Sequence, residues 1–409
     1  MSNWPRAQLQ RTTMTEMVTL DPTITDPEQI VTRVLAGCMR QGDTHVHIEP
    51  GETGYRLRCR RGDELRPAGT LSRSNGERLV AAARALARLS DPRLPEDGYF
   101  VVQSVAYWVT TIPVLEGQAL VISRGLPDRY PDLDQVLSGH QRTAYFEALS
   151  REKGLILLTG PMATDSVQAA LAYHGLHFLQ QLNGPDYPVA TVEWVARGNL
   201  ENVTRVVVSQ REGITFHGSL KRLAEFGTKA FRVGELHDLA TAEEAMRLTT
   251  QRRRIIVAGI SGTGDAASAL VRLVDMGVPV SVIADSVRLV LALRVFRKLC
   301  SACHKPVQVP RYSLLASGFP EGEVGDSLTL WEADRHGCKE CTGGFSGLRY
   351  ICQAMPMSKG VRAALIGGCQ CVDDIDEAAS ADGARTLKQE ILEAVRSGSI
   401  QLADADLAH

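Results

Sequence analysis

The chain has 409 residues, of which 44% are hydrophobic and 22% charged, and its formal net charge at pH 7 is −2. This length allows two or three domains with sizeable cores, and the balanced charge gives no electrostatic reason to expect nucleic acid or an anionic membrane as the main partner. No apolar run reaches the length of a membrane span and no signal peptide is recognisable, so we expect a cytoplasmic chain whose nine cysteines are thiols or metal ligands.

Residues 1–20 are polar and predicted to be flexible, and residues 21–126 have the pattern of a small α+β domain. Its first helix is predicted from Pro27, with Asp26 as the N-cap. The other elements are predicted as strands at 44–50, 55–60, 99–112 and 118–123 and a helix at 76–90. Residues 127–137 begin with Pro-Asp-Arg-Tyr-Pro-Asp, which is typical of a linker.

Residues 138–296 have the pattern of an α/β domain. A helix at about 139–152 leads into an apolar strand, and from there apolar strands alternate with helical patterns. The segments are 154–159, 165–181, 188–194, 204–208, 217–226, 229–234, 241–251, 254–260, 264–276, 279–283 and 284–299. This rhythm predicts a mainly parallel, doubly wound sheet. The chain then becomes irregular and cysteine-bearing at 297–355, and residues 356–409 end in a helical segment near 384–397 and a polar tail.

The segment around Gly160 is laid out like a strand, a phosphate-binding loop and the start of a helix. A P-loop requires the pattern G-x-x-x-x-G-K-[ST], because its lysine and hydroxyl contact the phosphates and magnesium. Here Asp165 stands where the second glycine belongs, Ser166 where the lysine belongs, and Val167 where the hydroxyl belongs. The segment therefore has the layout of a nucleotide site without its chemistry.

Four cysteines form the strongest single motif. Cys300 and Cys303 make one C-x-x-C pair, and Cys338 and Cys341 make another. Each pair can present two thiolates to one ion, and two pairs complete the tetrahedral set that zinc prefers. The gap between the pairs is long, so a subdomain is expected to fold between them. We predict a structural zinc site, with four ordinary buried thiols as the alternative.

A second motif is the apolar strand that ends in Gly234-Glu235. A carboxylate in that place resembles a Walker B acid, which could hold magnesium-bound water or act as a base. The alternative is an ordinary strand end that leads into a helix with a Thr241-x-x-Glu244 capping box.

Taken together, these motifs resemble the hexameric ATPases that power type II secretion and type IV pilus assembly or retraction. The resemblance extends over about residues 27–395, and the matching motifs occur in the order that the family has. They are Gln41–Pro50 (ASDIHIEP in the family), Arg93–Gly98 (RLPQDG), Val109–Pro113 with Gly117 (VSTLP and a glycine), Gly154–Pro161 (GLILVTGP), Gly234–Glu243 (GEIRD-x-ETAE) and Arg272–Val278 (RLLDMGV). The two cysteine pairs resemble the zinc module of the assembly-type members.

The resemblance implies a RecA-like, P-loop-NTPase-type core with a zinc module, preceded by a small α+β (PAS-like) domain. The departures from the family pattern are concentrated on the nucleotide chemistry. Of the family's acidic box only Glu193 remains, and the histidine box has no histidine. Trp108 and Ser123 occupy the places of arginines that the family directs at a neighbour's phosphates, although Arg124 is adjacent.

These departures argue against tight ATP binding. The vestigial nucleotide site comprises Gly160, Pro161, Thr164, Asp165, Ser166, Val167 and Glu193, and Glu235 would be catalytic only in an active enzyme. Losing the lysine removes a positive charge from the phosphates, and Asp165 adds a carboxylate where they would bind. We predict that Asp165 caps the following helix in place of a phosphate.

The predicted function is that of a catalytically impaired, structural or regulatory component of a pilus or secretion motor. We expect a homo- or hetero-hexameric ring with an active paralogue, an inner-membrane platform protein as partner, peripheral association with the inner membrane, and no nucleic acid. The alternatives are a divergent active ATPase and a sensory module that binds another ligand in the vestigial pocket. The run Arg252–Arg254 is expected to be a solvated face, with contact across a ring interface as the alternative.

Overall fold

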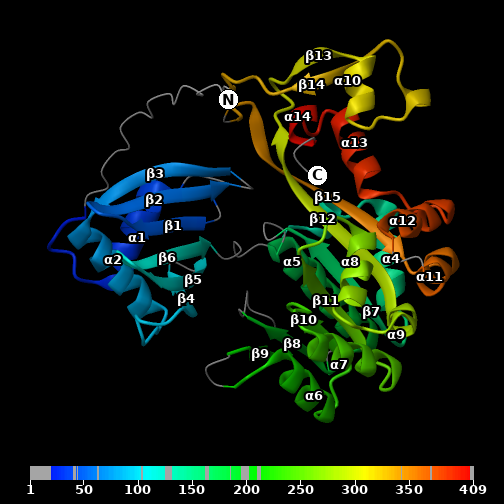
Figure 1. Cartoon of the computed structure of the whole chain (residues 1–409), viewed down its shortest axis with the longest axis horizontal. Helices are drawn as coiled ribbons and strands as arrows, with labels where there is room; N and C mark the ends of the chain where they lie inside the picture. Colours follow the sequence, from blue (N-terminus) through cyan, green and yellow to red (C-terminus); the bar gives the residue numbers. More distant parts are fainter. Residues whose placement is uncertain are drawn as a thin grey trace, which may run out of the picture. The chain divides into compact units, whose positions relative to one another are not determined.

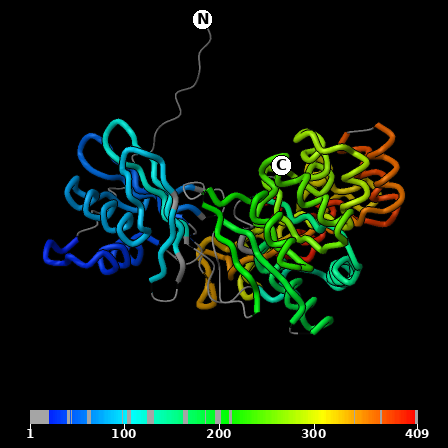
Figure 2. Tube along the Cα trace, turned by 90° about the horizontal axis from the view of Figure 1, so that it is seen from below, coloured from blue at the N-terminus to red at the C-terminus, as the bar shows by residue number. Residues whose placement is uncertain are grey.

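The computed structural model describes residues 20–39, 43, 45–61, 64–102, 105–124, 131–161, 165–184, 186–194, 202–209, 213–341, 343–368 and 371–405. The chain divides into two compact units, Met1–Asp128 and Arg129–His409 (Figure 1). The path of the chain through each unit can be followed in Figure 2. Among the described helices, none combines the length and the apolar character that a membrane span requires. Residues 127–130 of the predicted linker lie outside the described part, and a short helix, α3 (Leu133–Val136), occupies its end.

The N-terminal unit is a six-stranded antiparallel sheet in the order β3-β2-β1-β6-β5-β4, with two helices. Its elements are α1 (Pro27–Cys38), β1 (His45–Pro50), β2 (Gly54–Arg61), β3 (Glu64–Ser72), α2 (Arg73–Leu86), β4 (Glu96–Val102), β5 (Val105–Val114) and β6 (Gly117–Arg124). Alternate residues of the strands, such as Leu57 and Cys59, are buried in one core with the apolar faces of α1 and α2. The predicted N-cap is confirmed, because the Asp26 carboxylate accepts a hydrogen bond from the backbone N–H of Glu28.

Two predictions for this unit were wrong. The predicted strand 99–112 is in fact two strands, β4 and β5, which pair antiparallel. Strand β3 was missed because its sequence contains Pro67 and Gly69, residues that are poor strand formers. Since β3 lies at the edge of the sheet, its outer side has no ladder partner and the proline is tolerated there.

The C-terminal unit is built around a seven-stranded sheet in the order β15-β12-β7-β11-β10-β8-β9. Every neighbouring pair is parallel except β12 with β15, which confirms the predicted mainly parallel sheet. Its core elements are α4 (Gly139–Leu149), β7 (Gly154–Gly160), α5 (Asp165–Asn183), β8 (Val189–Glu193), β9 (Val203–Val207), α6 (Phe216–Glu225), β10 (Ala230–Val233), α7 (Leu239–Thr250), β11 (Ile255–Ser261), α8 (Ala266–Asp275), α9 (Val280–Ser286) and β12 (Val287–Leu299).

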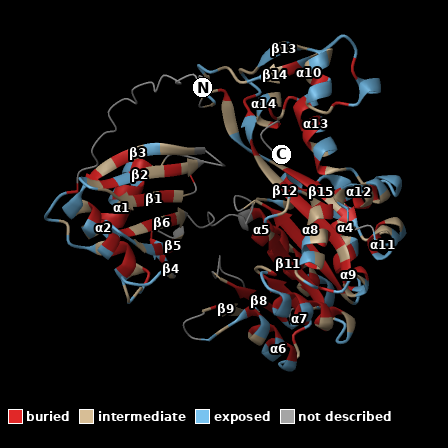
Figure 3. Cartoon of the chain, viewed as in Figure 1, coloured by how far each residue is buried: buried red, intermediate tan, exposed pale blue. Residues whose placement is uncertain are grey.

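Helices cover both faces of this sheet, and the central strands are buried (Figure 3). On β7, Leu155 and Leu157 belong to one core with α6, α7 and α8, whereas Ile156 and Leu158 belong to a second core with α4 and α5. This alternation explains why β7 reads as a continuous apolar run rather than as an amphipathic strand.

The predicted alternation fails at the end of the core. Segment 279–283 follows the helix α8 and should be a strand, but it lies in helix α9, and segment 284–299 forms strand β12 instead of a helix. Leucine, alanine and arginine in β12 are good helix formers, so local propensity favoured the wrong state. The segment forms a strand because it pairs with β7 on one side and with β15 on the other.

The remaining elements complete the unit. A two-stranded sheet with a short helix, as expected between the cysteine pairs, separates β12 from β15, and four helices follow. They are β13 (Lys305–Pro310), α10 (Arg311–Ala316), η3 (Glu321–Glu323), β14 (Ser327–Glu332), β15 (Phe345–Pro356), α11 (Lys359–Ile366), α12 (Val372–Ala381), α13 (Leu387–Arg396) and α14 (Leu402–Ala405). The helical segment predicted near 384–397 corresponds to α13.

Candidate functional site

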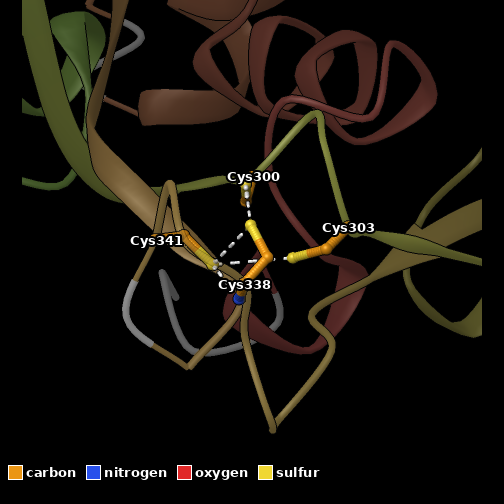
Figure 4. Close-up of side chains that lie close together, drawn as sticks. All are labelled: Cys300, Cys303, Cys338 and Cys341. Carbon is orange, nitrogen blue, oxygen red and sulfur yellow. Dashed lines mark hydrogen bonds between the residues drawn. The ribbon is translucent and has the colours of Figure 1, made fainter.

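The two cysteine pairs converge on one point, as predicted (Figure 4). Their four sulfur atoms all lie within 4.8 Å of one another. Cys300 follows the end of β12, and Cys338 and Cys341 precede β15, so the pairing of β12 with β15 brings the two knuckles together. The sulfur of Cys300 lies 3.8 Å from that of Cys338, and the sulfur of Cys303 lies 3.5 Å from that of Cys341.

This geometry fits a tetrahedral zinc ion. Four thiolates at a Zn–S distance of about 2.3 Å are about 3.8 Å apart from one another. The Cys338 and Cys341 sulfurs are separated by 3.7 Å, far longer than a disulfide bond. Because all four ligands come from the protein, no position is left for substrate, and the site would be structural.

The backbone around the cysteines supports thiolate charge. The N–H of Cys338 points at the Cys341 sulfur at 3.2 Å, and the N–H of Glu340 points at the Cys338 sulfur at 3.4 Å. Gly337 has φ +68°, and a Cβ there would come within 2.9 Å of the Gly343 nitrogen, so the tight turn requires glycine.

Two basic residues close to the cysteines in the sequence have carboxylate partners. Arg297 pairs with Asp404 at 3.0 Å, and Lys305 pairs with Asp334 at 2.8 Å. Of the other cysteines, Cys38, Cys59 and Cys352 are buried in the apolar cores, and Cys371 is exposed. Cys369 lies outside the described residues.

The predicted nucleotide residues gather at one edge of the large sheet. Strands β7, β8, β10 and β11 are parallel, so their C-terminal ends lie at the same edge, which we call the carboxyl edge. Gly160 ends β7, Glu193 ends β8, and Glu235 follows the end of β10. In open α/β sheets this is the edge where ligands bind.

The phosphate loop itself is only partly described. Pro161 is half-buried after β7, Thr164 lies outside the described residues, and α5 begins at Asp165. The side chains of Asp165 and Ser166 are likewise outside the described part, so capping by Asp165 stays a prediction. Val167 is 1% exposed and belongs to the apolar core, so this side chain takes no part in an exposed loop.

Glu193 is enclosed by two partners that the sequence analysis missed. Its Oε2 accepts a hydrogen bond of 2.6 Å from the Tyr173 hydroxyl and lies 3.1 Å from Nε of Arg232. The guanidinium of Arg232 also lies over the Tyr173 ring, 5.1 Å from its centroid. The Arg232 and Glu193 side chains are 8% and 4% exposed, so this is a buried ion pair. The signal in the sequence was a charged residue inside an otherwise apolar strand.

The segment that carries Glu235 is held from both sides by backbone hydrogen bonds. The N–H of Gly234 donates to the Val192 carbonyl at 2.7 Å, and the N–H of Leu236 donates to the Gly259 carbonyl at 2.8 Å. A Cβ on Gly259 would meet the Gly234 oxygen at 2.3 Å, so this close approach depends on glycine. Glu235 itself is half-buried.

The proposed capping box at Thr241 was wrong. Helix α7 begins two residues earlier, at Leu239, and Asp238 is its N-cap, since its carboxylate accepts from the N–H of Thr241 at 2.7 Å. Burial would raise the pKa of Asp238, but these hydrogen bonds and the nearby His237 hold it below its usual value. Glu244 instead pairs with Arg247 at 2.6 Å.

An aromatic group fills space at the same edge. Trp194, which replaces an acid of the family's box, packs edge-on against Phe216 with ring centroids 5.1 Å apart, and His237 lies 5.8 Å from Trp194. The Thr159 hydroxyl at the end of β7 hydrogen-bonds that of Thr263, in the loop where the family has its histidine box. In the N-terminal unit, Trp108 and Ser123 face each other across β5 and β6.

Comparisons with known proteins agree with this arrangement. A family model described as "Type II/IV secretion system protein" matches residues 25–407. The chain belongs to this family. It is 33% identical over 329 residues to the type IV pilus assembly ATPase PilB of Pseudomonas aeruginosa, covering 78% of the chain and 56% of that relative. It is 29% identical over 408 residues to the protein transport protein HofB homolog of Escherichia coli, covering 97% of the chain and 85% of that relative.

The solved structures support the fold. The Legionella pneumophila ATPase DotB matches with a TM-score of 0.60 at 13% identity, covering 96% of this chain and 98% of that one. The pilus retraction motor PilT, solved with bound ADP, also matches with a TM-score of 0.60, at 17% identity, covering 94% of this chain and 97% of that one. The C-terminal unit is accordingly RecA-like. The chain spans just over half the length of the PilB relative from Pseudomonas aeruginosa.

Proposed function

We propose that this chain is a catalytically impaired member of its family, which contributes structure or regulation to a pilus or secretion motor. The observation that carries the proposal is the buried contact of Glu193 with Arg232 and Tyr173. A carboxylate that activates water or holds a magnesium-bound water needs an accessible oxygen and a metal charge to interact with. Here a side chain of the same chain supplies the positive charge.

The phosphate loop supports the same conclusion. Asp165, Ser166 and Val167 replace the groups that would hold the phosphates and magnesium, and Val167 is packed in the core. Trp194 and Phe216 occupy the carboxyl edge with apolar surface. The phosphate loop and the surroundings of Glu193 therefore both favour a chain that does not turn over ATP.

The proposed partners follow from the family. We infer that the chain joins a hexameric ring, alone or with an active paralogue, and docks on an inner-membrane platform protein from the cytoplasmic side. A structural zinc ion bound by Cys300, Cys303, Cys338 and Cys341 would hold the subdomain between β12 and β15. None of these roles requires ATP turnover by this chain.

Calorimetry with magnesium-ATP tests the proposal directly. We expect no binding at micromolar nucleotide and no turnover by the purified chain. The same measurements should be repeated after co-purification with an active family member, whose rate we expect to change when this chain is present. Micromolar affinity of the isolated chain for magnesium-ATP would contradict the proposal.

A second candidate is a divergent ATPase that uses Glu235 as its base. The observation in its favour is that Glu235 is half-buried at the carboxyl edge and is not the acid enclosed by Arg232. Magnesium-dependent turnover that is lost in Glu235→Gln and kept in Glu243→Gln, an exposed acid of α7, would favour this candidate.

A further inference from the structure

The run Arg252–Arg254 lies at the edge of the large sheet opposite to Glu193 and Glu235. It directly precedes β11, and the parallel neighbour β7 starts beside it, since the N–H of Gly154 donates to the Arg254 carbonyl at 3.0 Å. We call the edge where these strands start the amino edge. The arginines are therefore remote from the phosphate loop of their own chain.

Three separate segments bring basic side chains to this place. Arg151 and Lys153 precede β7, Arg252–Arg254 precede β11, and Arg288 lies near the start of β12. A Cβ on Gly154 would lie 2.3 Å from Cγ of Arg288, so that side chain crosses the start of β7. We call Arg151, Lys153, Arg252, Arg253, Arg254 and Arg288 the basic patch.

Little of this positive charge is neutralised within the chain. Arg253 pairs with Glu152, which joins the turn before β11 to the turn before β7. Within the described residues, no carboxylate forms an ion pair with Arg151, Lys153, Arg252 or Arg254. Burial lowers the pKa of Arg288, and the positive charges of Arg151 and Arg362 lower it further, against the opposing effect of Asp285.

The backbone at the centre of the patch is in a costly conformation. Arg253 has φ +52°, in the left-handed region that glycine adopts without strain and other residues avoid. An arginine at this position therefore has to be explained by its side chain. Its ion pair with Glu152 joins the turn that carries Arg252 to the turn that carries Arg151.

A shallow, open hollow with one aromatic side chain in its lining adjoins the patch on helix α4. It has a volume of about 680 Å³ and is lined by Arg142, Thr143, Phe146, Glu147, Ser150 and Arg151. Phe146 is backed by Phe178, with ring centroids 4.5 Å apart, so its position is supported from below. Arg151 belongs to both the hollow and the patch.

We propose that the basic patch and the adjoining hollow bind an acidic polypeptide segment of a partner protein, with one apolar side chain of that segment resting on Phe146. Charge complementarity identifies the partner's chemistry. A lipid surface fits less well, because exposed acids limit the positive area: Asp186 and Asp275 lie at the same edge, and Asp285, which pairs with Arg362, lies close to Arg288. This inference is independent of whether the nucleotide site is active.

The test is fluorescence anisotropy with a labelled glutamate-rich peptide that carries one central phenylalanine. A matched peptide with glutamine in place of each glutamate is the control. We expect binding that weakens with salt, and about tenfold weaker binding to Arg151→Glu/Arg252→Glu, since each reversal removes a favourable charge contact. The control variant Lys221→Glu/Arg222→Glu changes the net charge equally on exposed residues of α6 and should bind as the native chain does.

Three results would overturn the proposal. They are no binding of the acidic peptide, equal binding of the glutamine peptide, or equal loss in both variants. Vesicles of phosphatidylcholine and phosphatidylglycerol should bind no better than vesicles of phosphatidylcholine alone, and strong binding through the patch would assign it to lipid instead. If the reversed variant does not fold, Arg151→Gln/Arg252→Gln replaces it, with thermal unfolding as the check. A lower melting temperature with unchanged peptide affinity would show that these arginines only stabilise the C-terminal ends of the preceding helices.

Discussion

The tetracysteine centre and the carboxyl edge were both predicted from sequence motifs, but their charges are balanced in opposite ways. The four cysteine sulfurs converge on one point, and the nearby basic residues Arg297 and Lys305 form ion pairs with carboxylates. Glu193 differs, because Arg232 supplies an opposite charge and Tyr173 donates a hydrogen bond to its Oε2 inside the protein. A cluster of charged groups that has no counter-charge within the protein indicates a ligand site. A charged group that the protein itself neutralises gives no such indication.

This contrast has a physical basis. Four thiolates within 4.8 Å repel one another unless a cation or protons neutralise them. A buried carboxylate carries a large desolvation cost that a well-placed guanidinium offsets. Both arrangements are stable only when the charge is balanced, but only the first requires an ion from outside.

Loss of the metal should have the largest effect. We expect Cys303→Ser/Cys341→Ser to lose bound zinc and at least about 4 kcal/mol of stability in the zinc subdomain, since structural zinc contributes about 10 kcal/mol or more in isolated fingers. Metal analysis and thermal unfolding measure this. Cys371→Ser, at an exposed cysteine, is the matched control and should keep about one zinc per chain. A native chain without zinc would break the comparison.

Removal of Arg232 should have the next largest effect. Arg232→Leu leaves Glu193 buried without its cation, which typically costs about 3–5 kcal/mol. The double variant Arg232→Leu/Glu193→Leu should recover most of that loss, because no charge is left to bury. Denaturant unfolding measures both, and Arg252→Leu, at an exposed arginine, should change stability by less than about 0.5 kcal/mol. Equal losses in the single and the double variant would show that the pair is not coupled.

Repair of the phosphate loop would sharpen the comparison. Asp165→Gly/Ser166→Lys/Val167→Thr restores the P-loop pattern, and we expect it to gain magnesium-ATP binding that stabilises the chain by about 2.7 kcal/mol at a hundredfold excess over Kd. Turnover should remain absent, because Glu193 is still held by Arg232. Thermal shift with and without nucleotide is the measurement, and Ser166→Lys alone is the control. Rapid hydrolysis by the repaired loop would show that the Glu193 contact is not inhibitory.

The smallest effect concerns a carboxyl group beside the carboxyl edge. Burial, and then the negative charge of Asp265, raise the pKa of Asp376 to about 6, against a hydrogen bond with Gln353 that lowers it. Asp265 caps α8, just after the loop that follows β11. The folded-state pKa of Asp376 lies above its unfolded value of about 3.9. Ionisation of this carboxyl group therefore does not affect the free energy of unfolding below about pH 4, and it lowers that free energy increasingly between about pH 4 and pH 6.

Asp376→Asn should therefore stabilise the chain by about 1 kcal/mol at pH 7.5, allowing for partial solvent screening, and by almost nothing at pH 4. Denaturant unfolding at the two pH values is the measurement. Asp373→Asn, an exposed acid on the same helix, is the control and should show a smaller difference. A gain at pH 4 equal to that at pH 7.5 would exclude ionisation as the cause.

Much of the fold could be predicted from patterns between residues that are close in the sequence. The parallel sheet followed from apolar runs alternating with helical spacing, and the N-cap at Asp26 followed from local chemistry. The predictions for segments 279–283 and 284–299 were wrong because their residues are compatible with either helix or strand. Pairing with the neighbouring strands determines which of the two forms. Arg232 was overlooked as a site residue because its partner comes from a strand that is distant in the sequence.

By itself, the sequence determined which groups are present: two cysteine pairs with metal-ligand spacing, a phosphate loop without its lysine, and two acids, Glu193 and Glu235, at strand ends. The tertiary structure alone decided which groups meet. Pairing of β12 with β15 brings cysteines from distant segments to one point, and the adjacency of β10 to β8 places Arg232 against Glu193. The reason is that spacing along a chain specifies local chemistry, whereas contact between strands depends on the order of the whole sheet, which is set by burying both of its faces.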